Sequence, residues 1–354
     1  MAFYETRTCL CFDDVLLVPK YSEIDSRHNI SLSATDVMGR SFDCNGKTFS
    51  LPIFASPMDT VVDEKTAVIF ANSGVSPILH RYCTEEQQVE MYKNVVRRLD
   101  CDSAPVGAAI GAGEFSLNRM INLYEAGCRF FCIDVAHGHH KMSLLAVRTI
   151  RHLYPECFIM AGNVATLEAF DALANAGANA VRVGIGGGSV CSTRIVTGHG
   201  VPTLQSVIDC AESETDAILV ADGGIRNTGD MVKSFAAGAD FVMLGSMLSC
   251  KDESPGEEKV VDGVKYKNYR GMASVSAQKD WRGKVSVAEG VDSWRPVSGN
   301  LNDTIESIKA GIRSGLSYSG CEKLSDFYAN SEFIKVSSRS SKENMPHGPG
   351  AIFR

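Results

Sequence analysis

The sequence predicts a single (β/α)8 barrel, and three observations lead to this fold class. Eight short apolar runs recur along the 354-residue chain, each bounded by turn residues. Segments with helical spacing lie between them, and several end in Ala-Gly or Ser-Gly, a common helix stop. The apolar runs are continuous rather than alternating, as in parallel strands that are buried on both faces. A doubly wound sheet is the alternative, but it rarely holds so many regular units.

The predicted elements follow one another in strict alternation. The strands are expected at residues 52–56, 76–80, 105–111, 129–134, 157–162, 180–185, 217–222 and 241–246. The helices are expected at 62–74, 84–99, 115–127, 141–153, 167–178, 203–213 and 229–239, with a last amphipathic segment at 304–316. Residues 1–354 therefore read as one barrel domain.

One connection breaks this alternation. Residues 249–302 separate the eighth strand from the last helix, and they include "YRGMAS" (269–274), "VAEGVDSW" (287–294) and both tryptophans. A connection of this length is usually functional or disordered, and we interpret this one as an insertion that covers the mouth of the barrel and contains a mobile flap. The polar tail at 337–354 is expected to be poorly ordered unless a neighbouring subunit holds it.

Composition and charge exclude several classes of protein. The formal net charge is −7 and there is no long basic run, which argues against nucleic acid as a partner. No run of about eighteen apolar residues occurs, so no membrane span is expected. The N-terminus has no signal-peptide pattern. The 12 cysteines show no CxxC or CxxH spacing, so we expect reduced thiols in a cytoplasmic protein.

The loops that follow barrel strands build the active site of this fold, and here they are rich in Gly, Asp, His, Asn and Cys. "GIGGGSVCSTR" (184–194) follows the sixth strand. It does not fit a dinucleotide fingerprint, because Ser189 and Cys191 stand where glycine is required. We interpret it as a phosphate nest shared with "ADGG" and "GSM"; the alternative is a tight turn without a ligand. Cys191 is a candidate nucleophile, the alternative being a small buried hydrophobe.

Other rim residues are candidates for binding. Asp134 ends the fourth strand and suits a ligand hydroxyl or amide. Asp222 ends the seventh strand, where it could bind a ribose diol or merely cap the next helix. His137, His139 and His140 lack the H-E-x-x-H spacing of a zinc site, so we interpret them as polar rim residues.

Taken together, the motifs resemble those of the IMP dehydrogenase/GMP reductase family. They are "FDDVLLVP", "SPMDTV", "GNVAT", "GIGGGSVCSTR", "TGHGVP", "ADGGI", "GSM" and "YRGMAS". The resemblance covers the chain from about residue 8 to about residue 336. "GGG" replaces the usual Gly-Pro-Gly, and Ser192 stands where threonine is common.

The resemblance implies a role for each candidate. Cys191 would attack C2 of a purine nucleoside monophosphate, with Thr193 and Glu289 as the proton-transfer pair. The substrate site would comprise Ser56, Met58, Ser189, Asp222, Gly223, Gly224, Gly245, Ser246, Tyr269, Gly271, Met272 and Gly290. Asp134, Ala136 and Asn163 would face the nicotinamide cofactor. Carbonyls of Gly184, Gly186 and Cys191 resemble the family's site for a monovalent cation such as K+. A homotetramer is also implied.

The family contains two activities, and the sequence has features of both. "IVTGHGVP", "ADGGIRNTGDM" and "ESPGE" resemble the dehydrogenase. The segment from Met272 to Glu289 is shorter than a dehydrogenase flap and has no Arg-Tyr pair, since Gly283 follows Arg282. No regulatory CBS module separates the helix at 84–98 from the third strand. We therefore expect a GMP reductase that uses NADPH. The alternative is an IMP dehydrogenase that uses NAD; a nucleotide-binding regulator without turnover is disfavoured by the retention of Cys191, Thr193 and Glu289.

Overall fold

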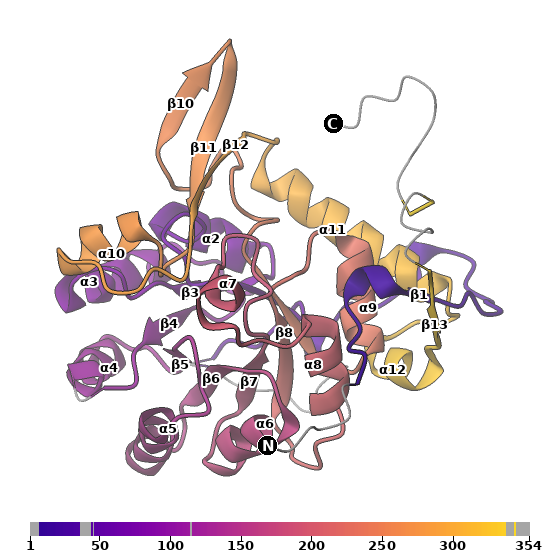
Figure 1. The fold of residues 1–354 in the computed structure, drawn as a ribbon, viewed down its shortest axis with the longest axis horizontal. Coiled ribbons are helices and arrows are strands. Elements are labelled where there is room, and N and C mark those ends of the chain that lie inside the picture. Colours follow the sequence, from indigo (N-terminus) through magenta and orange to yellow (C-terminus); the bar gives the residue numbers. More distant parts are fainter. Residues whose placement is uncertain (1–6, 36–43, 45, 114, 338–342, 345–354) are drawn as a thin grey trace.

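The structure is a computed structural model that describes residues 7–35, 44, 46–113, 115–337 and 343–344. At its centre, eight parallel strands pair in chain order from β2 to β9, and β9 pairs with β2 to close a barrel (Figure 1). The predicted (β/α)8 barrel is thus confirmed, and the doubly wound sheet is wrong.

Each predicted strand and helix has its counterpart in the structure. The strands are β2 (Ile53–Ala55), β3 (Ser76–Leu79), β4 (Gly107–Ile110), β5 (Phe130–Asp134), β6 (Phe158–Val164), β7 (Ala180–Val183), β8 (Ile218–Asp222) and β9 (Phe241–Leu244). The helices are α2 (Glu64–Asn72), α3 (Glu85–Val96), α4 (Phe115–Glu125), α5 (Lys141–Leu153), α6 (Leu167–Asn175), α8 (Thr203–Cys210), α9 (Thr228–Ala236) and α11 (Leu301–Ser317).

Capping side chains fix where several of these helices begin. Asp63, Thr84, Thr166, Asn227 and Asn300 each accept a hydrogen bond from a backbone N–H of the first helical turn. Such caps satisfy donors that have no partner within the helix. The helices therefore start just after each rim loop, which leaves the loops free to carry chemistry.

The barrel interior is apolar at one end. Phe49 precedes β2, and its ring contacts those of Phe54, Phe130, Phe158 and Phe241 at centroid distances of 4.9–5.8 Å. Three of these four partners are the first residues of their strands. The aromatic cluster therefore fills the amino end of the barrel, and the polar residues gather at the carboxyl end.

The long connection is folded rather than irregular. It forms β10 (Glu258–Val261), β11 (Val264–Arg270), α10 (Val275–Arg282) and β12 (Asp292–Pro296). The strands pair as a three-stranded antiparallel sheet, whose β10–β11 hairpin extends away from the barrel (Figure 1). Arg270 anchors the sheet, because its guanidinium bonds Asp59 of the barrel rim at 2.5 Å and Asp280 of α10 at 2.6 Å. The sequence predicted the insertion but not these elements, and whether its flap moves stays a prediction.

Short elements complete the chain. β1 (Val15–Leu17) pairs antiparallel with β13 (Phe333–Lys335), which joins the two ends of the described chain. The others are η1 (Phe12–Asp14), η2 (Arg27–Asn29), α7 (Thr193–Thr197), η3 (Leu324–Asp326) and α12 (Phe327–Asn330). None of the 12 cysteines forms a disulfide. Within the described residues, no helix is long and apolar enough to cross a membrane. The tail predicted at 337–354 lies, except for residues 337, 343 and 344, outside the described residues.

Candidate active site

The carboxyl ends of the barrel strands open into a cavity of about 320 Å³. Nearly all candidates named from the sequence line it. These are Ser56, Met58, Asp134, Ala136, Asn163, Gly184, Gly186, Ser189, Cys191, Thr193, Asp222, Gly223, Gly224, Gly245, Ser246, Tyr269, Gly271, Met272 and Glu289. They come from loops that are far apart in sequence and that meet because parallel strands all end at the same rim.

Gly290 is the exception, since it is absent from the cavity lining. It forms a β-bridge with Cys191 instead. A Cβ at position 290 would lie 3.1 Å from the Ser274 nitrogen and 3.3 Å from the Val190 oxygen. These contacts are tighter than those of most real Cβ atoms, so glycine lets the insertion lie directly against the cysteine loop.

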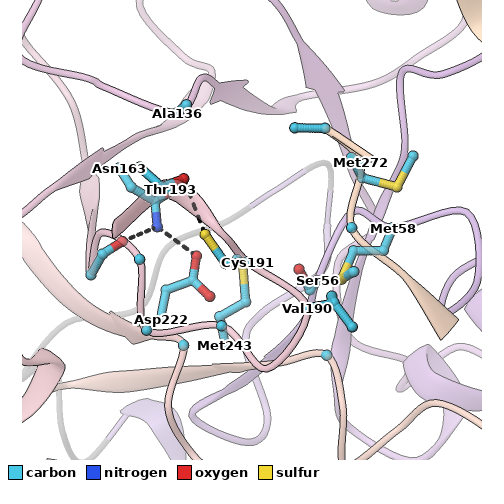
Figure 2. Close-up of a pocket in the computed structure, with 18 of the residues that line it drawn as sticks. Ser56, Met58, Ala136, Asn163, Val190, Cys191, Thr193, Asp222, Met243 and Met272 are labelled. Atoms are coloured by element: carbon cyan, nitrogen blue, oxygen red, sulfur yellow. Dashed lines mark hydrogen bonds between the residues drawn. The ribbon is translucent and has the colours of Figure 1, made fainter. Parts of the chain in front are cut away.

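Cys191 is half-buried at the cavity, and the alternative of a buried small hydrophobe is therefore wrong. Its Sγ lies 3.1 Å from Thr193 Oγ1, and Figure 2 shows the two side chains pointing toward each other. Thr193 is the first residue of the short helix α7, and the backbone N–H of Cys191 donates to the Gly188 carbonyl at 3.0 Å. The thiol is thus held within reach of both a hydroxyl and the cavity.

Backbone hydrogen bonds join the insertion to the cysteine loop. Ser192 N donates to Glu289 O at 2.9 Å, and Val291 N donates to Val190 O at 2.9 Å. Glu289 is half-buried and lines the cavity with Cys191 and Thr193. The three residues therefore face one space, although Glu289 lies almost a hundred positions further along the chain.

A buried guanidinium links the two rim carboxylates. Arg182 Nη1 donates to Asp134 Oδ1 at 2.7 Å, and its Nε and Nη2 donate to Asp222 Oδ2 at 3.1 and 2.8 Å. Burial lowers the pKa of Arg182, but the charges of Asp222 and Asp134 outweigh this effect and raise it well above the ordinary value. Arg182 is therefore a permanent cation that fixes both carboxylates.

Asp222 is bound on one side only. Its Oδ2 also accepts from Asn163 Nδ2 at 2.8 Å, and Asn163 Nδ2 donates in addition to the Gly184 carbonyl at 2.8 Å (Figure 2). No donor among the described residues contacts Oδ1, which can accept from a ligand hydroxyl. The following helix, α9, is capped by Asn227, so the interpretation of Asp222 as a helix cap is wrong.

The glycine loops meet at another part of the cavity. Gly223 and Gly224 have φ angles of +91° and +77°, a region that favours glycine. A Cβ on Gly223 would lie 3.1 Å from the Gly188 nitrogen, so the loops after β7 and β8 are in close contact. Tyr269 is buried beside Gly245, and burial raises the pKa of its hydroxyl to about 12 despite the hydrogen bond from Ser189. A neutral phenol and closely spaced amides can together donate to an anion.

The carbonyls considered for a monovalent cation already have neighbours. Gly184 O accepts from Asn163, and a Cβ on Gly186 would lie 2.8 Å from Arg194 Nε. Arg194 itself donates to Ile185 O at 3.2 Å and to Val201 O at 2.6 Å. A guanidinium thus stands beside the ring implied by Gly184, Gly186 and Cys191, and the K+ site stays a prediction.

The rim histidines have local roles. His140 caps α5, since its Nδ1 accepts from Met142 N at 3.2 Å. The rings of His137 and His139 lie 6.5 Å apart, edge to face. In the described part of the chain, no group of three or more His, Cys, Asp and Glu side chains is arranged to hold a metal ion.

Several site residues were not identified from the sequence. Arg182 lines the cavity from inside β7, and the signal for it was a single charge within the apolar run "AVRVGI". Arg81 and Tyr82 also line the cavity, and Arg81 Nη2 donates to the Asp134 carbonyl at 3.0 Å. Arg295 reaches Ser189 from β12, where nothing in the sequence indicated that it faces the barrel.

Comparison with known proteins places these features in context. The model of the "IMP dehydrogenase / GMP reductase domain" family matches residues 9–347. The chain is 37% identical over 333 residues to inosine-5'-monophosphate dehydrogenase of Nitrosopumilus maritimus, covering 83% of this chain and 70% of that protein. It is 34% identical to the same enzyme of Borreliella burgdorferi, covering 97% of both, and 34% identical to GMP reductase of Ascaris suum, covering 94% and 95%. The chain spans about half of some longer dehydrogenases, such as 52% of that of Bacillus subtilis.

A solved structure is similar over almost the whole length. It is a cysteine-to-alanine variant of GMP reductase from Trypanosoma brucei in complex with guanosine 5'-monophosphate. The TM-score is 0.89 with 26% sequence identity, and the match covers 97% of this chain and 98% of that one.

Proposed function

The chain belongs to the IMP dehydrogenase/GMP reductase family, whose members are oxidoreductases acting on purine nucleotides, and from this premise we propose that it is a GMP reductase. The reaction is the NADPH-dependent conversion of GMP to IMP and ammonia. Cys191 is the nucleophile, and Thr193 and Glu289 move the proton that the leaving amine requires.

The arrangement at Cys191 supports the first half of this reaction. The thiolate forms a bond to C2 of the purine, and the C2–N bond breaks. Glu289 donates a proton, which the Thr193 hydroxyl relays, and ammonia leaves. A thioimidate remains between C2 and Sγ. The 3.1 Å contact between Sγ and Thr193 Oγ1 brings the relay to the reacting atom.

In the second half, the C2–S bond breaks while C2 accepts a hydride, and this restores the thiolate and gives IMP. The nicotinamide cofactor supplies that hydride when bound. Asp134, Ala136 and Asn163 line the cavity where we propose that it lies. Asp222 Oδ1 would accept from a ribose hydroxyl, and the loops carrying Ser189, Gly224 and Gly245 would hold the 5'-phosphate.

The observation that favours the reductase is the lack of a second base in the insertion. From residues 271–290, the cavity is lined by Gly271, Met272, Ala273, Val287 and Glu289. Arg282, which a dehydrogenase would need to activate water, is exposed, and its guanidinium lies 4.3 Å from the centre of the Trp281 ring. An insertion whose residues 271–290 bring no arginine or tyrosine to the cavity lining suits a reaction that must avoid hydrolysis of the thioimidate.

The alternative is an IMP dehydrogenase, which would oxidise IMP to XMP with NAD. The sequence identities favour this reading, because the dehydrogenase of Halalkalibacterium halodurans is 44% identical over 252 residues whereas the reductase of Ascaris suum is 34% identical. The covered share argues against that dehydrogenase as a guide to function, since the chain spans only 52% of it.

We further propose a cytoplasmic homotetramer of single-barrel subunits without a CBS module, and a K+ ion at the Gly184 loop.

Two steady-state assays separate the candidates. Purified protein is mixed with GMP and NADPH, or with IMP and NAD+, and the nicotinamide absorbance is followed. We expect oxidation of NADPH that depends on GMP and releases ammonia, and no reduction of NAD+ by IMP. Cys191→Ala is the matched control and should abolish turnover. Production of XMP with NADH, and none of IMP from GMP, would establish the dehydrogenase instead.

A further inference from the structure

Arg295 lies on the face of β12 that is turned toward the barrel. Side chains alternate along β12, with Ser293 and Arg295 half-buried and their neighbours exposed. In the register with β11, Ser293 is opposite Tyr269 and Arg295 is opposite Lys267. Tyr269 and Lys267 are both buried, so the inner face of this sheet carries two cations and a phenol next to the site.

The Arg295 guanidinium contacts two residues of the cavity wall. Its Nη2 donates to Ser189 Oγ at 3.2 Å, a contact between positions 106 residues apart in the sequence. Its central carbon lies 4.8 Å from the centre of the Tyr269 ring, within the range of a cation–π interaction. Ser189 and Tyr269 both line the cavity. These contacts hold the guanidinium charge next to Ser189 and Tyr269 at the cavity wall.

The charge of Arg295 is not balanced by the protein. Lys267 pairs with Glu258 at 3.1 Å, but Arg295 forms no ion pair within the described part of the chain. The two arginines that line the cavity are engaged elsewhere: Arg182 bonds Asp134 and Asp222, and Arg81 lies 3.7 Å from Asp134. The glycine loops themselves contribute amides and hydroxyls. A dianionic ligand there would lack a full countercharge without Arg295.

We propose that Arg295 is a binding residue for the 5'-phosphate, supplying the cation that makes this site select nucleoside monophosphates over nucleosides. The proposal rests on the proposed function in placing a purine nucleotide in the cavity, and it holds equally for GMP and IMP. The phosphate would accept from the guanidinium, from the Ser189 hydroxyl that the guanidinium bonds and from the hydroxyl of Tyr269, over whose ring the guanidinium lies. A forked planar donor suits a phosphate better than the point charge of a lysine.

Calorimetry tests this with matched ligands that differ only in the phosphate. The wild type, Arg295→Ala and Arg295→Lys are titrated with GMP and guanosine, and with IMP and inosine. We expect Arg295→Ala to weaken monophosphate binding roughly 10- to 100-fold, the size of a charge-assisted hydrogen bond, and Arg295→Lys to weaken it less. Guanosine and inosine should bind all three proteins alike, which also shows that the variants are folded.

Lys259→Ala is the matched control. Lys259 is a cation of the same sheet, on β10, and its amine lies 4.0 Å from the Trp294 ring on the exposed side. It should bind both ligand types like the wild type. Unchanged GMP affinity in Arg295→Ala, or an equal loss for guanosine, would overturn the role of Arg295. A wild type that binds neither monophosphate would instead overturn the proposed function and this role with it.

Discussion

At the scale of single residues, the site depends on charges that are paired within the barrel. Arg182 is 7% exposed at its side chain and holds two carboxylates at once. Desolvating a cation between two anions is costly, and the geometry must be good for such a group to persist. Here Asp222 ends β8, which is next to β7, and Asp134 ends β5, which is separated from β7 by β6, so the guanidinium links three strands.

Arg182→Met should destabilise the protein strongly. It removes the cation and leaves two carboxylates facing a buried space, which typically costs about 3–5 kcal/mol. Arg182→Lys keeps the charge but cannot donate to both carboxylates at once, so it should lower the free energy of unfolding by less than Arg182→Met does. Thermal unfolding of the two variants beside the wild type measures this. A methionine variant as stable as the wild type would show that the carboxylates do not need the charge.

Glu289→Gln should lower GMP reduction by about 10²–10⁴-fold, because the shape of the side chain is kept and its proton is lost. The rate of ammonia release should fall more than the rate of hydride transfer to a preformed adduct. Single-turnover measurements of both steps across a pH series distinguish them. A variant that reduces GMP at the wild-type rate at every pH would return Glu289 to the status of a structural flap residue.

The position of the rim could be predicted because its loops directly follow apolar strands, where barrel enzymes keep their chemistry, whereas the roles of most individual residues are implied only by the family resemblance. Arg182 and Arg295 could not be predicted in this way. Arg182 lies inside a strand, and a lone charge there does not reveal its partners 40 and 48 residues away. Arg295 depends on the pairing of β11 with β12, which brings it to Ser189 only in three dimensions.

At the scale of elements, one buried glutamine fixes the loop that follows α10 in the insertion. Gln278 of α10 donates from Nε2 to Ala273 O at 2.9 Å and to Val287 O at 3.2 Å. Its Oε1 accepts from the backbone N–H of Ser286 at 2.9 Å. The glutamine thus closes the loop between α10 and the segment that carries Glu289.

Gln278→Ala should reduce kcat about tenfold or more while changing nucleotide binding little. A loosened loop misplaces Glu289, and misplacement of about 1 Å is costly in catalysis, whereas the phosphate and ribose contacts come from other loops. Steady-state kinetics supply kcat and KM. Lys279→Ala, at the exposed neighbouring position, is the control and should behave as the wild type. A rise in KM without a change in kcat would contradict this view of the loop.

The elements of the barrel were predictable and those of the insertion were not. Continuous apolar runs such as "RFFCID" indicate buried strands by themselves, because the burial is complete on both faces. β10, by contrast, is exposed along its whole length, and β12 is exposed at alternate residues. Their sequences carry no continuous apolar signal, and tertiary pairing decides their structure.

At the scale of the whole molecule, stability should depend on pH through a half-buried carboxyl, that of Asp240, between β8 and β9. Asp240 Oδ2 accepts from Leu219 N at 2.8 Å, and burial raises the pKa of Asp240 to about 6, opposed by that hydrogen bond. Because the folded pKa exceeds the unfolded one, this group stabilises the fold below the unfolded pKa. That contribution is lost as the pH rises through about 6.

Asp240→Asn should therefore raise the free energy of unfolding at pH 7.5 by on the order of 2 kcal/mol, since the amide keeps an acceptor and carries no charge. The difference from the wild type should shrink as the pH falls below 6. Denaturant unfolding over this pH range measures it, with the exposed Asp102→Asn as control. A difference between Asp240→Asn and the wild type that stays constant with pH would contradict the assignment.

The closing seam of the barrel has a consequence for how the protein is made. β2 pairs with β9 through Ile53 and Val242, so the first barrel strand to be synthesised lacks one of its two neighbours until the last strand is made. Until then the nascent sheet is open, with unpaired strand edges, and such partly folded chains are prone to aggregation. Phe49 and Phe54 are synthesised early, but Phe241, which packs against both, comes almost two hundred residues later. A nascent chain arrested before Phe241 therefore lacks both the closing strand and an aromatic partner of these two rings.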